Sequence, residues 1–311
     1  MKMTIEDNRI YDFNVIKKTL PKTDVSGITE YEIPVEYLSR VIDQGNIDCC
    51  PACALASNLT AISASQDNKK EYSVAYIYGK HRTADSTRPG MLLEPALKSM
   101  LNLGSVPYEM LPQLIEMPEV KEIVKSKPEL DEYAKDSAIA GYCKIRWSNT
   151  DEKINNFKLA IINYNLPIII ESKTAFPEKH CVIAYGFEER DGYFYVKFQN
   201  SWGKNWAKGG RGTIPIGDVS SMYMIFPKEL TMPFTDVKKD DWFYNTVRNA
   251  YLAGYVNGKD ETTFDPNGYI TRAEHCAVLD RVLKRQNEIH TLEMIALEER
   301  LEELEKKIRE R

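Results

Sequence analysis

The chain has 311 residues, a formal net charge of −5 and 28% charged residues, which is an ordinary composition for a globular protein. This length predicts two domains, and the net negative charge gives no general attraction to phosphate backbones or acidic lipids, so nucleic acid is excluded as an expected partner. The opening residues carry no apolar export segment, and no apolar run is long enough to predict a membrane span.

The first half of the chain is mainly helical in its patterning. Residues 1–35 mix charged residues with Thr, Asp and Pro and are expected to form an N-terminal arm or a short strand. Apolar residues at helical spacing follow, and Gly104 is expected to end one of these helices. The predicted helices span residues 51–65, 73–82, 91–104, 118–135 and 151–165.

Strand patterns dominate the next part of the chain. β-branched and aromatic residues form short apolar runs, and the turn Arg190-Asp191-Gly192 separates two of them. The predicted strands span residues 166–172, 180–190, 193–203 and 210–216, and they are expected to form one antiparallel sheet. A helical half followed by a sheet half predicts an α+β domain with a seam between the two halves.

A change in composition near residue 230 predicts a second module. We expect a short helix over residues 242–255, a turn-rich loop, and a helix over residues 271–285 that Thr271 caps, with Glu274 three residues later. Apolar residues at alternating spacings then predict a short coiled coil, and they are Met294, Leu297, Leu301, Leu304 and Ile308. The predicted segments of the whole chain are 1–35, 36–230, 231–286 and 287–311.

The six cysteines are too sparse for a small disulfide-bonded scaffold, so reduced thiols are expected. Cys49, Cys50 and Cys53 are close together at a predicted helix start. A zinc site is disfavoured there because adjacent cysteines rarely ligate one ion and no matching Cys or His pair follows. Neither a metal nor another cofactor is therefore expected. The other three, Cys143, Cys181 and Cys276, are expected in the core.

One cysteine lies where a reactive thiol would be placed. A thiol attacks carbonyl groups as its thiolate, and Cys50 comes just before Pro51, at the predicted helix N-terminus, where the helix dipole favours negative charge. His180 begins an apolar strand, and Asn200 lies at the end of the next strand of the hairpin. This topology brings the thiol, the imidazole and the amide to one cleft at the seam.

The segments DQGNIDCCPACALA and NSWG resemble motifs of the papain-like (C1) cysteine peptidases, with the resemblance running over roughly residues 36–228. His180 and Asn200 follow Cys50 at the separations along the chain that are known for this family. The resemblance implies a two-lobed fold, with a helical half and an antiparallel sheet or barrel half, and a polypeptide substrate. It assigns Cys50 as nucleophile, His180 as the base that takes and returns the proton, Asn200 as the residue that orients the imidazole, and Gln44 as an oxyanion donor.

The same resemblance implies two substrate-binding residues. Trp202 would shield the hydrogen bond between His180 and Asn200 from water at the edge of the substrate cleft. Gly90 would correspond to the glycine that pairs with the substrate backbone.

The sequence also departs from the pattern of the family. The usual Gly-Ser before the nucleophile is Asp48-Cys49, the aromatic residue after it is Pro51, and Ile47 replaces a disulfide cysteine. A negative charge on Asp48 would oppose ionisation of the thiol unless it points away. Cys49 or Cys53 could form a reversible disulfide with an oxidised Cys50, and the alternative is that both are simply small residues.

Residues 234–283 resemble a single S-layer homology repeat, a module that implies anchoring to pyruvylated cell-wall polysaccharide. The matching residues are Phe234, Asp236, Val237, Trp242, Gly254, Gly258, Phe264, Pro266 and the run Thr271-Arg272-Ala273-Glu274. Trp242 offers a stacking face for a sugar and Arg272 a fork for a carboxylate, or else Trp242 is core and Arg272 caps a helix. Since these repeats commonly act in threes, we expect a homo-oligomer through residues 287–311, a trimer or alternatively a dimer.

The leading hypothesis is a cysteine endopeptidase tethered to a bacterial cell envelope, on the extracellular surface or in a phage particle. One alternative is a non-catalytic wall-binding or phage structural protein with a retired protease fold. Another is a hydrolase of peptidoglycan stem peptides, because a wall anchor would hold the thiol beside them.

Overall fold

In a computed structural model of the chain, the described residues are 10–17, 24–65, 69–82, 90–112, 119–227, 233–238, 240–252 and 255–284. The chain divides into two compact units, Met1–Leu230 and Thr231–Arg311. The predicted coiled coil over residues 287–311 lies outside the described residues. The finer division into four segments stays a prediction.

The first unit alternates helices and strands along the chain. Its elements are β1 (Ile10–Asp12), α1 (Phe13–Ile16), β2 (Glu30–Glu32), η1 (Val35–Tyr37), α2 (Cys50–Ser65), α3 (Val74–His81), α4 (Leu93–Met100), η2 (Tyr108–Met110), α5 (Glu119–Ser126), α6 (Leu130–Ala134), η3 (Lys135–Ser137), β3 (Gly141–Ile145), α7 (Thr150–Tyr164), β4 (Ile168–Ser172), β5 (His180–Arg190), β6 (Tyr193–Gln199), β7 (Arg211–Pro215), η4 (Ile216–Asp218) and β8 (Val219–Phe226).

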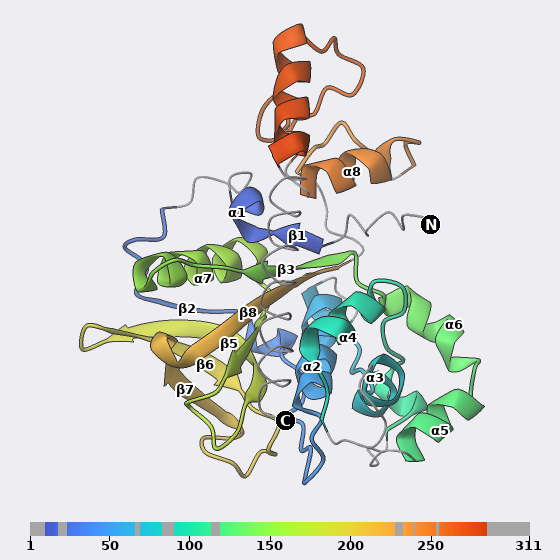
Figure 1. Ribbon diagram of the computed structural model, residues 1–311, viewed down its shortest axis with the longest axis vertical. Helices are drawn as coiled ribbons and strands as arrows, with labels where there is room; N and C mark the ends of the chain where they lie inside the picture. The colour runs from blue at the N-terminus through green and yellow to red at the C-terminus, as the bar shows by residue number, and fades with distance from the viewer. Residues whose placement is uncertain are drawn as a thin grey trace, which may run out of the picture. The chain divides into compact units, whose positions relative to one another are not determined.

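Helix α2 is the element that the two halves of this unit share. Its small and aliphatic residues are buried on all sides, as expected of a helix without a polar face. It packs against α3 on the helical side and against β4 and β5 on the sheet side, while α3 to α6 gather beside it (Figure 1). The Nδ2 of Asn58 also donates to the carbonyl of Pro167, at 2.8 Å, just before β4. The first residue of α2, Cys50, therefore lies at the seam between the halves.

The other half is one open sheet with the strand order β1-β3-β8-β4-β5-β6-β7, and β2 pairs with the second half of β5. All neighbouring strands are antiparallel except β1 and β3, which are parallel. The α+β fold predicted from the sequence is confirmed, and of the two expected forms, sheet or barrel, the structure has the open sheet. Helix α7 lies against this sheet, with the ring of Phe157 edge-on to Phe187 of β5 and Phe194 of β6.

The β5–β6 hairpin has the predicted turn, and the backbone angles of this turn explain why Asp191 and Gly192 occur there. Asp191 and Gly192 have φ values of 54° and 78°, a pair of positive angles typical of two-residue hairpin turns, in which Gly is favoured. In the register of this hairpin Ile183 lies opposite Gln199. The start of β5 and the residue after β6 therefore meet at the same end of the sheet.

Four strands were not predicted as separate elements. The arm contributes β1 and β2 to the sheet, and β2 is held by the buried ammonium of Lys197 in β6, which pairs with Glu30 and with Glu32 at 2.6 Å. Strands β3 and β8 come from short apolar runs, which periodicity alone does not separate from helix segments.

Two expectations about the helical half need correction. The predicted helix over residues 118–135 is divided into α5 and α6, because Pro128 cannot continue a helix and restricts the residue before it. Gly104 does not end α4, which stops at Met100. It is needed because a Cβ atom there would lie 2.1 Å from the carbonyl oxygen of Ser137.

The second unit has a small aromatic core. Phe234, Val237 and Val247 are buried, and four further aromatic residues pack against them, namely Phe243, Tyr244, Tyr251 and Phe264. Its helices are α8 (Tyr244–Leu252) and residues 272–284. The predicted cap of the second helix is confirmed, since the Thr271 hydroxyl donates to the Glu274 carboxylate at 2.7 Å and the Glu274 N–H donates to that hydroxyl at 3.2 Å.

Among the described residues, no helix combines the length and apolar character that crossing a membrane requires.

Candidate active site

Cys50 begins α2, so its backbone N–H is one of those at a helix N-terminus that have no intrahelical acceptor. Pro51 is tolerated in the first turn because its missing N–H would have had no partner there either. Cys50 is partly exposed, whereas Cys49 and Pro51 on either side of it are buried. The start of the helix thus presents one thiol to the surface of the seam.

His180 and Asn200 come together because β5 begins where β6 ends. The His180 Nε2 lies 2.7 Å from the Asn200 Oδ1, and the same oxygen accepts the backbone N–H of Ser201 at 2.8 Å. Since an amide oxygen only accepts, Nε2 carries the proton in this bond, and Nδ1 is the nitrogen left to accept another. The contact therefore fixes both the orientation and the tautomer of the imidazole.

Trp202, the residue expected to shield this hydrogen bond, lies against the imidazole. Its ring stacks on the His180 imidazole, with centroids 4.6 Å apart and an interplanar angle of 26°. Phe176 adds an edge-on contact to the imidazole, at 4.8 Å. Because His180 and Asn200 are both buried, the bond is formed in a region from which water is largely excluded.

Gln44 is held by the segment that contains the NSWG motif. The backbone N–H of Gln44 donates to the carbonyl of Ser201 at 2.9 Å, and the Ser201 hydroxyl donates to the Gln44 Oε1. One hydrogen of the Gln44 Nε2 goes to the carbonyl of Ile47, at 2.8 Å. The second hydrogen has no acceptor within the described residues and is available to a ligand.

We call the pairing of residues 42–44 with residues 201–203 the lobe clasp. Besides the Gln44–Ser201 bonds, it contains a bridge between Asp43 and Trp202 and a hydrogen bond from the Gly203 N–H to the carbonyl of Ile42, at 2.9 Å. Gly203 has a φ of 74°, and a Cβ atom there would lie 2.7 Å from the carboxylate of Asp43. Glycine is therefore required at this position for both backbone conformation and space.

A cleft of about 510 Å³ collects most of the predicted site residues. Its lining includes Gln44, Cys50, Gly90, His180 and Trp202. Asn200 lies behind His180 and does not line the cleft. Gly90 has a φ of 95°, and its carbonyl accepts the Arg82 Nε at 2.7 Å, so one of its backbone groups already has a partner.

The surroundings of the thiol oppose its ionisation. The pKa of Cys50 is raised to about 12, mainly by burial. The Cys181 backbone N–H lowers this pKa by a smaller amount, and the negative charges of Glu171 and Asp48 act in the same direction as burial. Burial also lowers the pKa of His180 below its usual value of 6.5, although the bond to Asn200 acts in the opposite direction. Both directions favour the neutral forms of the thiol and of the imidazole at neutral pH.

Glu171 and Cys181 both act on the pKa of Cys50, and the sequence did not predict that they lie near this thiol. Glu171 lies opposite Cys181 in the β4–β5 pairing, its carboxylate is buried, and it pairs with the Lys179 ammonium at 2.8 Å. The available signal was a glutamate at the end of an otherwise apolar strand, a residue that is rarely buried without a partner.

The other cysteines of the cluster do not face the cleft. Cys49 and Cys53 are buried, and their Sγ atoms lie 3.8 Å apart. The expectation that the remaining three cysteines are core holds for Cys143 and Cys181, but Cys276 is exposed. Among the described residues, no group of three or more His, Cys, Asp or Glu side chains could hold a metal ion.

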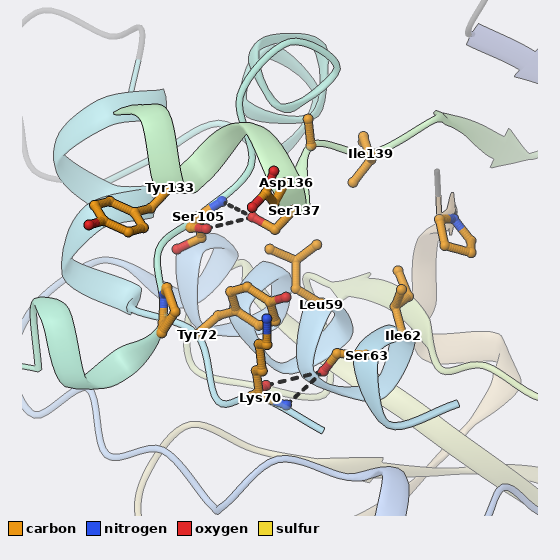
Figure 2. A pocket seen from close by; sticks show the side chains of 13 residues that line it. Leu59, Ile62, Ser63, Lys70, Tyr72, Ser105, Tyr133, Asp136, Ser137 and Ile139 are labelled. Atoms are coloured by element: carbon orange, nitrogen blue, oxygen red, sulfur yellow. Dashed lines mark hydrogen bonds between the residues drawn. The ribbon is translucent and has the colours of Figure 1, made fainter. Parts of the chain in front are cut away.

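A second cavity, of about 400 Å³, lies around the far end of α2 (Figure 2). The Ser137 hydroxyl donates to the carbonyl of Ser105, and the Ser63 hydroxyl accepts the backbone N–H of Lys70 at 2.9 Å, so much of its polar lining is already paired. It contains none of the predicted site residues.

The predicted sugar-binding residues of the second unit are both exposed. Trp242 is 90% exposed, which rules out the alternative that it is core, and Arg272 lies on the surface near the start of its helix. A cavity of about 590 Å³ in this unit is lined by other residues, among them Lys259, Asp265 and Tyr269.

Most of the other matching residues in the second unit are structural. Asp236 accepts the backbone N–H groups of Phe264 and Asp265, at 2.9 and 2.7 Å, which lowers its pKa. A Cβ atom on Gly258 would lie 2.3 Å from the ring of Phe234. Gly254 lies outside the described residues.

Comparisons with known proteins support two distinct parts. The family model of the S-layer homology domain matches residues 233–274. An endoglucanase from Bacillus sp. (strain KSM-635) is 36% identical over 56 residues, and the exoglucanase XynX from Acetivibrio thermocellus is 39% identical over 57 residues. Each match covers 18% of this chain, and the chain spans only 6% and 5% of the lengths of these relatives.

The solved structures that match are similar over a larger share of the chain. Xylellain, a cysteine protease from Xylella fastidiosa, has a TM-score of 0.55 and 18% identity, covering 72% of this chain and 94% of its own. Digestive procathepsin L 3 of Tenebrio molitor gives 0.54 and 14%, covering 70% and 76%, and the bromelain protease from Ananas comosus gives 0.51 and 14%, covering 64% and 99%. The chain therefore has the fold of papain-like cysteine proteases together with an S-layer homology domain.

The electrostatics of the cleft predict how Cys50 reacts with pH. Because a thiol with a raised pKa gains thiolate steadily as pH rises, the rate of alkylation by iodoacetamide should increase about tenfold per pH unit between pH 7 and pH 9. Asp48→Asn removes one of the negative charges and should raise the rate at pH 8 by about twofold, a modest effect because Asp48 is exposed.

Asp151→Asn, an exposed change on α7, serves as the matched control and should leave the alkylation rate unchanged. A rate that is already constant between pH 6 and pH 9 would instead indicate a preformed thiolate–imidazolium pair and would contradict this assignment.

Proposed function

We propose that the first unit is a cysteine endopeptidase that hydrolyses polypeptides at the cleft between its two halves. The observation that carries this proposal is the His180–Asn200 hydrogen bond, covered by Trp202, in a cleft whose opposite wall holds Cys50 at a helix N-terminus. A nucleophile, an oriented base and a group that orients the base are the three parts that thiol-dependent acyl transfer requires.

Each residue has a defined part in the proposed reaction. The Nδ1 of His180 takes the thiol proton as Cys50 sulfur attacks the scissile carbonyl, and returns it to the leaving amine, which gives an acyl-enzyme. Water then attacks the thioester with His180 again as base, which releases the acid and restores the thiol. Asn200 keeps Nε2 protonated and the ring in place throughout.

Two donors are available for the oxyanion that forms in each attack. The backbone N–H of Cys50 is free of an intrahelical acceptor, and the second Nε2 hydrogen of Gln44 is unused within the described residues. Because Ser201 and Ile47 hold the Gln44 amide, this donor is oriented before the substrate binds. Donors fixed in this way commonly contribute about 3 kcal/mol to the transition state. Gly90 is proposed to pair with the substrate backbone on the same cleft wall.

Cys50→Ala should lower casein hydrolysis by at least about 10³-fold, because the nucleophile is lost while the fold is retained. Cys276→Ser, which removes an exposed thiol from the second unit, is the matched control and should retain full activity. Iodoacetamide should label Cys50 in active protein and abolish turnover in proportion.

The outcomes of this experiment separate the alternatives. Wild-type protein that cleaves neither casein nor purified peptidoglycan would leave a non-catalytic binding protein with a retired fold. Cleavage of peptidoglycan in a zymogram, dependent on Cys50 and without casein turnover, would instead identify a hydrolase of stem peptides.

We further propose that the second unit tethers this activity to cell-wall polysaccharide, which places the protein at a cell envelope or in a phage particle. The match of residues 233–274 to the S-layer homology domain supports this, as does the exposure of Trp242 and Arg272. An exposed indole provides a stacking face for a sugar ring, and a guanidinium pairs with a carboxylate such as that of a pyruvyl group.

Trp242→Ala and Arg272→Ala should each weaken sedimentation of the full chain with purified Gram-positive cell walls by about tenfold, because each removes roughly one contact worth 1–2 kcal/mol. Cys50→Ala should sediment with walls as wild type does. If a variant that carries both substitutions bound cell walls as well as wild type does, these two residues would not be the binding site. The cavity that Tyr269 lines would then be the candidate site.

Residues 287–311 are proposed to form a coiled coil that joins several copies of the chain. The described part of the adjoining helix leaves apolar side chains exposed, with Leu279 49% and Leu283 60% in contact with solvent. Their separation of four residues places them on one face of the helix, which a second copy of the chain would cover.

Sedimentation equilibrium at micromolar concentration should give a trimer, or a dimer as the alternative. Leu301→Asp and Leu304→Asp together should shift the chain to monomer, since charges in the seam of a coiled coil are strongly unfavourable. Glu302→Asp, outside the predicted seam, should leave the mass unchanged. A monomeric wild-type chain would overturn the proposal.

A further inference from the structure

The proposed peptidase reaction uses one of three thiols at the start of α2. The other two, Cys49 and Cys53, lie directly behind the cleft with their Sγ atoms 3.8 Å apart, and both are free thiols. Each is buried, so a solute in the cleft reaches Cys50 and neither of these two. Two buried thiols in contact beside an accessible one need a reason beyond packing.

Helix geometry makes Cys53 the neighbour of both other thiols. Residues three and four positions apart lie on the same side of a helix, whereas adjacent residues do not face each other. Cys53 is in contact with Cys49, and it is three positions from Cys50 on the same helix, close enough for the charge of Cys50 to act on its pKa. The Cα separation of residues three or four apart in a helix also falls within the range that disulfides span, roughly 4.4–6.8 Å.

We propose that Cys53 and Cys49 form a resolving pair that returns Cys50 to its thiol state after oxidation by a peroxide. The peroxide converts the Cys50 thiol to a sulfenic acid and is itself reduced to water or an alcohol. The Cys53 sulfur then attacks the sulfenic sulfur, the Cys53 proton and the hydroxyl leave as water, and a Cys50–Cys53 disulfide forms.

The last step moves the disulfide away from the cleft. The Cys49 sulfur attacks the Cys53 sulfur, the bond to Cys50 breaks, and the proton of Cys49 passes to the released Cys50 sulfur. One peroxide has then oxidised two thiols to the buried Cys49–Cys53 disulfide, and Cys50 is again a thiol. Reduction runs through the accessible sulfur: the Cys50 sulfur attacks the Cys53 sulfur and its proton passes to the released Cys49 sulfur. An external dithiol then attacks the Cys50 sulfur of the re-formed Cys50–Cys53 disulfide, which returns all three cysteines to thiols and leaves the dithiol oxidised.

The environment of Cys53 disfavours its thiolate in the reduced protein, so its proton has to leave as it attacks the sulfenic sulfur. Its hydrogen bond with Cys49 is the largest cause of its raised pKa, followed by burial, so the group stays protonated while Cys50 is reduced. The contact with Cys49 is already made in the reduced protein, which means that only a small sulfur movement is needed to reach disulfide bonding distance.

The test is differential alkylation after treatment with hydrogen peroxide at pH 8. Free thiols are blocked with N-ethylmaleimide in denaturant, so that buried thiols also react, and disulfides are then reduced and labelled with iodoacetamide. The peptide that contains all three cysteines is sequenced by mass spectrometry. Wild-type protein should carry the maleimide on Cys50 and the carbamidomethyl group on Cys49 and Cys53. This readout requires no peptide cleavage, so its result does not depend on whether the protein is a peptidase. Only the purpose of protecting Cys50 rests on the proposed peptidase function.

Substitutions separate the steps. Cys49→Ser should trap the Cys50–Cys53 disulfide, and Cys53→Ser should yield at least about fivefold more sulfinic acid on Cys50 than wild type at the same peroxide dose. Cys143→Ser, a buried thiol in β3, is the control and should behave as wild type.

Equal sulfinic acid on Cys50 in wild type and Cys53→Ser would overturn the proposal, as would a disulfide between Cys50 and Cys181. If Cys53→Ser does not fold, the dose response of the wild type decides. The Cys49–Cys53 disulfide should appear at peroxide concentrations below those that give sulfinic acid, and the reverse order would contradict the proposal.

Discussion

The lobe clasp is the constraint on which the candidate site depends. Residues 42–44 lead into α2, which carries Cys50, and residues 201–203 follow Asn200 at the end of β6. Backbone bonds between these segments and the Ser201–Gln44 contact tie the thiol side of the cleft to the imidazole side. Because the bonds are between backbone groups and a buried amide, the separation of the two walls is set by secondary structure and not by flexible side chains.

This arrangement fixes the positions of the cleft residues, but it does not favour the negatively charged form of the Cys50 thiol. The helix N-terminus and the Cys181 N–H favour a thiolate on Cys50, but burial and the carboxylates of Glu171 and Asp48 outweigh them and raise the pKa of the thiol. In the proposed reaction, such a site would depend on His180 as the base during attack, because the thiol still carries its proton. The stacked Trp202 serves this role, since a dry His180–Asn200 bond keeps Nδ1 as the only basic nitrogen of the ring.

Much of this could be predicted from local patterns. The hairpin from β5 to β6 has its own turn residues, and α2 has a proline in its first turn, so the positions of His180, Asn200 and Cys50 within their elements followed from short segments of sequence. Glu171 could not be placed near Cys50 in this way, because their proximity depends on the β4–β5 register and on α2 crossing both strands. For the arm the sequence predicted a short strand as one of two alternatives, but the positions of β1 and β2 did not follow from it, since each is three residues long and is stabilised by its partners.

The CCPAC segment shows how one short stretch serves several requirements at once. Pro51 starts the helix without losing a hydrogen bond, Cys50 in front of it takes the partly exposed position, and Cys49 and Cys53 are buried. A pair of thiols at these two positions, in contact with each other and one helical turn from the accessible sulfur, adds a chemical capacity that the fold alone does not need.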